Sequence, residues 1–253
     1  MKQAIRNSVM LRSRQSKVDH FYTLFEPGMS VLDVGVSGKG HRAGGAPVNY
    51  LLQTYRYAPD TYTALAVHDV SGLQSAHPGK RFVRYDGKIF PFENGEFDWV
   101  FSNAVIEHVG DRDAQLLFVN EMLRVGRYVF FTTPSKFFPI ETHTYMPLIH
   151  WNERLFDRWL RKHKPEWRRK TGLWLLSAGD VRRLMDDSAA QAYDVSKNRL
   201  LLWPMTMTVI ATRLTQLPEP KQAVHAPLYR LGAEGAAAPP NAATRGMGIP
   251  KAR

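Results

Sequence analysis

Acidic residues follow three apolar segments of the sequence, each at the point where a buried strand would end. Asp33 closes "VLDV", Asp69 follows "TYTALAV" and Asp86 follows "RFVRY". Carboxylates at such positions can accept hydrogen bonds from the hydroxyl and amino groups of a ligand, provided that the strands lie side by side. Glycines after Asp33 would let the backbone approach that ligand closely. The pattern predicts a binding site at one edge of a sheet.

Three kinds of ligand compete for the glycine-rich stretch "GVSGKG", residues 35–40. A phosphate-binding P-loop is excluded because Gly40 stands where Ser or Thr must follow the lysine. A dinucleotide fingerprint fits Gly38, Gly40 and Ala43, but Pro47 indicates that the next helix starts too late to meet a pyrophosphate. A nucleoside without phosphates remains, with one acid for ribose and another for the adenine amine. Three acids and no fixed lysine favour a cationic ligand, such as the sulfonium of S-adenosylmethionine (SAM).

The elements that would position these residues alternate between helix and strand. Such alternation predicts an α/β fold, a doubly wound and mostly parallel sheet with helices on both faces. The "SAGD" start of residues 177–187 is a capping pattern, which marks a helix N-terminus. Helices are expected over residues 17–25, 47–56, 111–125 and 177–187, and strands over 30–35, 61–67, 81–85, 97–102, 127–134 and twice within 192–214.

Composition narrows the function classes. The chain has 253 residues, 44% of them hydrophobic, and no cysteine, which excludes disulfides, thiolate catalysis and cysteine-ligated zinc. No apolar run approaches the roughly 20 residues of a membrane span. The basic N-terminus lacks the apolar core of a secretory signal, so we expect a cytoplasmic protein.

Net charge is +11, and much of it lies in the first 17 residues and in residues 154–170. The second segment has apolar residues at helical spacing, which predicts an amphipathic helix that packs on its own domain and offers a route to peripheral membrane contact. We expect three parts: a basic N-terminal extension or helix (1–16), one domain (17–215) with a substrate or lid segment (134–175), and a disordered tail rich in Pro, Ala and Gly (216–253).

Three stretches resemble the class I SAM-dependent methyltransferases. "VLDVGVSGKG" is similar to their first motif, although Ser37 and Lys39 stand where glycines are usual. "VRYDGKIFPFENGEFDWVFSNAVIEHVG" resembles the third to fourth strands of the branch that methylates small molecules, lipids and quinones. "YVFFTTPSKFFPIETHTYMPLIHW" resembles the fifth strand and substrate segment of bacterial methyltransferases of polysaccharide assembly. The resemblance covers residues 18–214 and implies a Rossmann-like, seven-stranded sheet with a reversed last strand.

The resemblance also implies SAM as the cofactor and a set of binding residues. The turn of Asp33, Val34 and Gly35 would meet its methionine part. Asp69 with Val70 would bind the ribose. Asp86 with Gly87 would flank the adenine, and Asn103 with Ala104 would lie near the donor methyl.

Methyl transfer needs alignment, and a hydroxyl acceptor also benefits from a base. His108 and Glu107 are the candidate catalytic residues, although a helix-start histidine and a helix-dipole charge explain them equally well. His143, Tyr145 and His150 are candidates for an acceptor pocket. The spacing of these histidines matches no recognised metal-ligand pattern, so we assign no metal site.

The expected activity is methyl transfer to a small-molecule, glycan or lipid-linked acceptor, and we expect no nucleic-acid partner. Two alternatives stay open: a non-catalytic binding protein on the same fold that uses its basic surfaces, and an NAD-dependent oxidoreductase.

Overall fold

The structure is a computed structural model, and it describes residues 2–38, 48–168 and 173–220. All of these fall within the first of two units into which the chain divides, residues 1–222.

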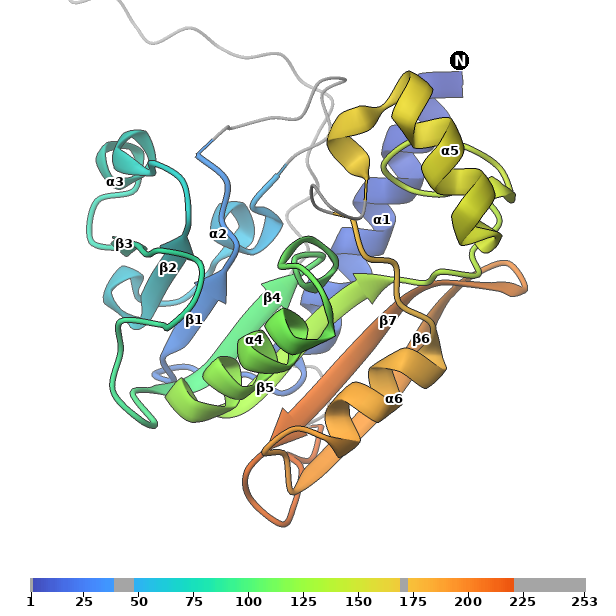
Figure 1. Ribbon diagram of the computed structural model, residues 1–253. Helices are drawn as coiled ribbons and strands as arrows, with labels where there is room; N and C mark the ends of the chain where they lie inside the picture. Colours follow the sequence, from blue (N-terminus) through green and yellow to red (C-terminus); the bar gives the residue numbers. More distant parts are fainter. Residues whose placement is uncertain (1, 39–47, 169–172, 221–253) are drawn as a thin grey trace, which may run out of the picture. The chain divides into compact units, whose positions relative to one another are not determined.

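A single seven-stranded sheet organises the described residues, in the order β3-β2-β1-β4-β5-β7-β6 (Figure 1). Strands β1 to β5 pair in parallel, whereas β7 runs antiparallel to both of its neighbours. This confirms the α/β fold with a reversed last strand. Because β1 lies between β2 and β4, the strand order reverses there, and ligands bind at such a switch point. The strands are β1 Val31–Val34, β2 Tyr62–Ala66, β3 Arg81–Arg84, β4 Phe97–Asn103, β5 Gly126–Pro134, β6 Ala192–Leu200 and β7 Trp203–Thr212.

Helices cover both faces of the sheet. Figure 1 shows α4 and α6 on one face and α1 on the other. The capping box predicted at Ser177 is present, since its hydroxyl and the Asp180 carboxylate bond each other's backbone amides. The helices are α1 Lys2–Tyr22, α2 Tyr50–Thr54, α3 Ser71–Ala76, α4 Arg112–Val125, α5 Glu153–His163 and α6 Ala178–Asp186. Short 3-10 turns include η2 Ile106–His108 and η4 Pro165–Trp167.

The N-terminal helix differs from the sequence expectation. It begins at Lys2 and ends at Tyr22, so the basic N-terminal segment, for which the sequence left an extension or a helix open, is helical. The many basic residues of this segment hid a sparse helical stripe, in which Arg14, Val18 and Phe21 follow one another at i, i+4 and i+7 and are all buried. Two other expectations fall outside the described residues, namely the helix start at Pro47 and nearly all of the tail.

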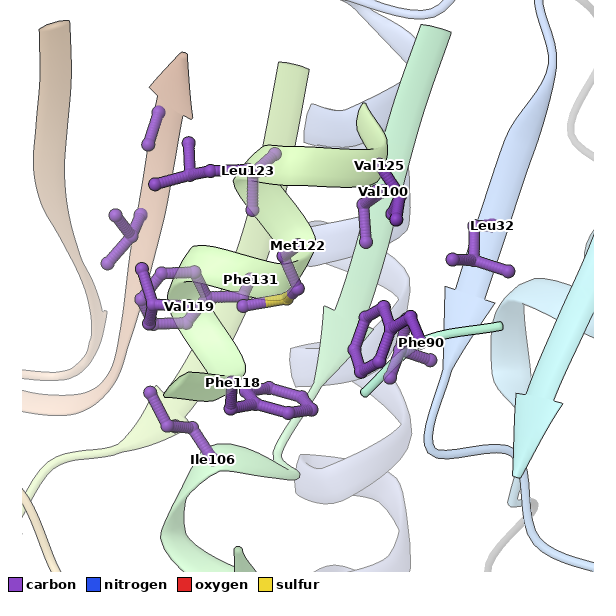
Figure 2. Packing of buried hydrophobic residues seen from close by; sticks show 14 of the residues in the cluster. Leu32, Phe90, Val100, Ile106, Phe118, Val119, Met122, Leu123, Val125 and Phe131 are labelled. Atoms are coloured by element: carbon purple, nitrogen blue, oxygen red, sulfur yellow. The ribbon is translucent and has the colours of Figure 1, made fainter. Parts of the chain in front are cut away.

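Two apolar cores hold the layers together. The core under α1 and α2 is aromatic, and Phe21 packs edge-on against Trp99 with their ring centroids 5.5 Å apart. The opposite core lies under α4 and α6. Figure 2 shows Phe118 and Met122 of α4 facing Phe131 of β5 and Phe90 of the loop before β4. Burial on both faces explains why the central strands read as continuous apolar runs.

Helix α5 carries the amphipathic segment. Phe156 and Leu160 are buried against Leu173, whereas Leu155 remains exposed. The predicted packing of the stripe on its own domain is therefore present, although only in part. None of the described helices is both long enough and apolar enough to cross a membrane.

Phe118→Ala should destabilise the fold by about 3–5 kcal/mol, because it leaves a cavity in a fully packed core. Its neighbour Leu117 is 39% exposed on the same helix, so Leu117→Ala should cost less than about 1 kcal/mol. Urea denaturation of both variants measures the difference. Equal losses would mean that α4 does not face the sheet as described.

Candidate active site

The turn after β1 brings the backbone close to the end of β4. Gly35 has a φ of +91°, and a Cβ added there would lie 2.3 Å from Val105 Cγ2. Its amide donates to the Leu65 carbonyl at 2.9 Å, which fixes the turn to β2 as well. Gly38 is equally constrained, because its Cβ would lie 2.2 Å from the carbonyl oxygen of Asp69. The sequence pattern left the role of Gly38 open, whereas the structure requires glycine there. Lys39 and Gly40 lie outside the described residues.

Asp33 is buried at the end of β1. Tyr62 donates a hydrogen bond from its hydroxyl to Asp33 Oδ2 at 2.5 Å. Burial raises the pKa of Asp33 to about 7, and the Tyr62 hydrogen bond offsets only part of that rise. Val34 beside it is also buried. Of the three acids predicted for the site, Asp33 is thus the one held inside the protein, where its charge state depends on its surroundings.

The backbone bends sharply where β4 ends. Ala104 has a φ of 58°, a conformation that costs free energy for a residue with a side chain. Its amide donates to the Thr132 carbonyl at 2.9 Å, and the Thr132 hydroxyl donates to Asn103 Oδ1 at 2.8 Å. The end of β5 therefore holds this strained turn in place, next to Gly35.

The other two acids lie at neighbouring strand ends but in the open. Asp69 is exposed, and its carboxylate accepts hydrogen bonds from the amide and hydroxyl of Ser71, which lower its pKa. Val70 beside it is buried. Asp86 is exposed too, and Gly87 after it has a φ of +87° and lies beside Val67 at the end of β2. The carboxyl ends of β1, β2 and β3 thus carry their acids along one edge, as predicted.

A cavity of about 400 Å³ opens between these turns and α1. Gly35, Asn103 and Ala104 line one side, and Thr142 and His143 line another. Asp69 and Asp86 do not line it. Of the residues predicted for the methionine and donor end of the site, Gly35, Asn103 and Ala104 therefore line this cavity.

Two buried cations line the cavity from α1, and the sequence reasoning missed both. Arg14 and Lys17 are 8% and 5% exposed, and their i, i+3 spacing places them on one helix face. Burial and the Arg14 charge lower the pKa of Lys17 to about 8, although the nearby Glu107 carboxylate raises it. Asn49 was also missed. Its side chain bonds both the amide and the carbonyl of Ser37, which anchors the glycine-rich turn.

A cluster of titratable side chains adjoins the cavity through His143. Glu107 is fully buried. Its Oε2 accepts a hydrogen bond from the Thr133 hydroxyl at 3.1 Å, and its Oε1 lies 4.0 Å from His108 Nε2. The rings of His108 and His143 meet edge to face at 4.8 Å between centroids. Glu141 accepts a hydrogen bond from His143 Nδ1 at 2.8 Å. The structure thus brings together three of the residues that we singled out for chemistry: Glu107, His108 and His143.

The other two residues predicted for an acceptor pocket lie elsewhere. Tyr145 is 43% exposed, and the Arg6 guanidinium of α1 stacks on its ring at 4.1 Å. His150 is buried, donates a hydrogen bond from Nε2 to the Phe138 carbonyl at 2.9 Å, and lines a different cavity beneath α5. Neither lines the cavity beside Gly35. Their separation from His143 depends on how the loop after β5 folds back, which residue spacing does not reveal.

The described residues fit the methionine and sulfonium end of SAM. The Gly35 turn has no room for a side chain, and the cavity beside it is lined by the amides of Asn49 and Asn103 and by Arg14 and Lys17, whose charge suits the methionine carboxylate. The exposed carboxylates of Asp69 and Asp86 stand at the adjoining strand ends, where hydroxyl and amino groups of a nucleoside would need acceptors.

Asp33→Asn should change how stability depends on pH in the ligand-free protein. An acid whose folded pKa is raised loses stability as pH climbs from its unfolded pKa, near 4, to its folded value, and the loss is complete above about 7. Asparagine does not ionise. The free energy of unfolding of the variant minus that of the native chain should therefore be on the order of 2–4 kcal/mol larger at pH 8 than at pH 4. Urea denaturation at both pH values measures it. A constant difference between the two proteins would show that Asp33 ionises without penalty.

Comparison with known proteins agrees with this geometry. Residues 32–131 match the sequence family described as "Methyltransferase domain". The matched segment runs from β1 into β5 and contains Asp33, Asp69, Asp86 and Asn103. No curated protein sequence matches the chain.

Solved structures show the same fold at low identity. A SAM-dependent methyltransferase from Methanosarcina mazei is 13% identical, with 78% of this chain and 97% of that chain covered and a TM-score of 0.51. A Rhodobacter sphaeroides protein assigned provisionally to the Zn-dependent alcohol dehydrogenases is 19% identical, with 77% and 88% covered and a TM-score of 0.54. At these identities the likeness concerns the fold alone. Residues 32–131 thus match a methyltransferase domain, and the described residues have the fold of SAM-dependent methyltransferases.

Proposed function

We propose that this domain transfers a methyl group from SAM to a small-molecule, glycan or lipid-linked acceptor that carries an anionic group. The observation that carries the proposal is the cavity beside Gly35. In it, the turns that adjoin the donor end of the site face two buried cations and His143 across a space of about 400 Å³.

The cavity supports alignment of two reactants. When bound, SAM supplies a methyl group that its sulfonium has already activated, so the chain's main task is to place the acceptor in line. Gly35 defines where the donor end can lie, because its turn leaves no room for a side chain beside Val105. Thr142 and His143 face this turn from the segment after β5. An acceptor bound between these walls would meet the donor at one defined position.

The buried cluster behind His143 supports assistance to the proton that leaves the acceptor. Glu107 Oε1 accepts no hydrogen bond from any residue that the structure describes, although it is fully buried. A buried acceptor without a partner lowers the stability of the fold, and a catalytic role is one reason that such groups occur in native proteins. We therefore keep Glu107 and His108 as the residues that assist deprotonation, with His143 as their contact with the cavity.

The charge of the cavity supports an anionic acceptor. Arg14 and Lys17 are desolvated, and buried cations are stabilised by an anion. SAM carries a carboxylate, which one cation can bind. A second buried cation on the next turn of α1 favours a further anionic group in the cavity, such as a phosphate or carboxylate of the acceptor.

Cofactor choice can be tested with two glycine variants. Calorimetric titration should show micromolar binding of SAM and S-adenosylhomocysteine, and none of NAD. Gly35→Ala should weaken S-adenosylhomocysteine binding at least tenfold, because its Cβ would overlap Val105. Gly28→Ala is the matched control: Gly28 also has a positive φ, but a Cβ there meets nothing within 4 Å. Binding of NAD, or equal effects of the two variants, would contradict the proposal.

The charge of the acceptor can be tested with variants of α1. Labelled methyl groups from SAM should enter the fraction of a cell extract that an anion exchanger retains. Lys17→Met should lower this transfer about tenfold or more, since a charge-assisted hydrogen bond contributes roughly 1.5–3 kcal/mol. Arg12→Met removes the same charge from an exposed position of α1 and should leave the transfer unchanged. Label confined to unretained, neutral material would show that the acceptor is not anionic.

A further inference from the structure

We infer that Glu107, His108 and His143 form a binding site for a divalent transition-metal ion such as Zn²⁺. One potential ligand atom from each side chain lies within 4.8 Å of the other two. Two imidazoles and one carboxylate are a donor set suited to such ions. The sequence spacing of these residues matches no ligand pattern because η2 and the loop after β5 bring them together only in the fold.

The Glu107 carboxylate is an independent indication that the site has an occupant. It is 0% exposed, Thr133 bonds only its Oε2, and its Oε1 has no hydrogen-bond partner in the part of the chain that the structure describes. That unpartnered oxygen is the atom that lies 4.0 Å from His108 Nε2. Leaving a buried carboxylate oxygen unsatisfied is costly, and a cation at this point would remove that cost.

Glu141 supplies the outer partner that metal-binding histidines commonly have. Its Oε1 accepts the Nδ1 proton of His143 at 2.8 Å, which leaves Nε2 as the nitrogen available to an ion. Glu141 is itself held by the amide and hydroxyl of Thr144, at 2.6 and 2.7 Å. The orientation of the His143 ring is therefore fixed before any ion binds.

The surroundings also suit an ion. Trp167 of η4 packs over both imidazoles, with its centroid 5.7 Å from that of His108 and 4.9 Å from that of His143. An apolar cover of this kind limits the access of water to a metal site. Ion–ligand bonds of about 2.0–2.2 Å place ligand atoms roughly 3–4 Å apart, so small side-chain rotations would close the cluster around an ion.

The site bears on the proposed function, because His143 lines the cavity beside Gly35. An ion there would lie at the acceptor end, where it can polarise an acceptor oxygen and ease loss of its proton. This role rests on the proposed function, whereas the binding of the ion does not.

The test uses the full chain, stripped of metal with a chelator and then dialysed against Zn²⁺ or Co²⁺. We expect one ion per chain by elemental analysis, and visible absorption bands from bound Co²⁺. Glu107→Gln and His143→Ala should each weaken Zn²⁺ binding at least tenfold and abolish the bands. His163→Ala, an exposed histidine of α5 outside the cluster, should bind as the native chain does. Thermal unfolding of the metal-free variants shows that they remain folded.

Two results would overturn the inference: no stoichiometric Zn²⁺ in the native chain, or equal Zn²⁺ affinity in the native and cluster variants. The latter would place binding at other histidines. Titration of metal-free protein with S-adenosylhomocysteine separates this question from the proposed function. If that ligand fails to bind while Zn²⁺ binds, the methyltransferase proposal fails and the metal site stands. If that ligand binds while Zn²⁺ does not, only the metal site is contradicted.

Discussion

The parallel pairing of β1 with β4 is the constraint on which the site depends. The register pairs Val34 with Ser102, so β1 and β4 end within one residue of each other. Gly35 then turns back toward Leu65 while Val105 follows the strained Ala104, and the two turns meet at a distance that only glycine allows. A slip of one residue would direct Asp33 to the opposite face of the sheet. The two cores on either side hold this register.

Helix α1 converts that edge of the sheet into a cavity. Its lower part, including Phe21, belongs to the aromatic core beneath β1, β4 and β5. Its upper part extends past the strand ends (Figure 1), where Arg14 and Lys17 line the cavity. The free energy of core packing thus offsets the cost of burying two cations. Such burial lowers the pKa of Lys17 and makes the cavity attractive to anions.

Three carboxylates of the described residues are buried at this end of the sheet, and hydrogen bonds satisfy two of them. Asp33 is held by Tyr62, and Glu141 by His143 and Thr144, and in each case hydrogen bonds offset part or all of the cost of burial. Burial by itself raises the pKa of Glu141, but its hydrogen bonds outweigh that effect and hold the pKa at about 2. Among these three carboxylates, Glu107 alone has a buried oxygen without a hydrogen-bond partner in the described residues. This contrast is the reason for proposing a ligand at Glu107.

The sequence by itself determined the strands, most of the helices, the α/β class and the order of acids along the sheet edge, because these depend on local periodicity and on residues next to strand ends. Motifs that are contiguous in the chain also indicated the methyltransferase family that residues 32–131 match. Tertiary structure alone decided the rest. Lys17 and Glu107 are 90 positions apart, and His143 meets His108 only because the loop after β5 folds back over η2. Such encounters depend on packing between distant segments, which leaves no periodic trace in the sequence.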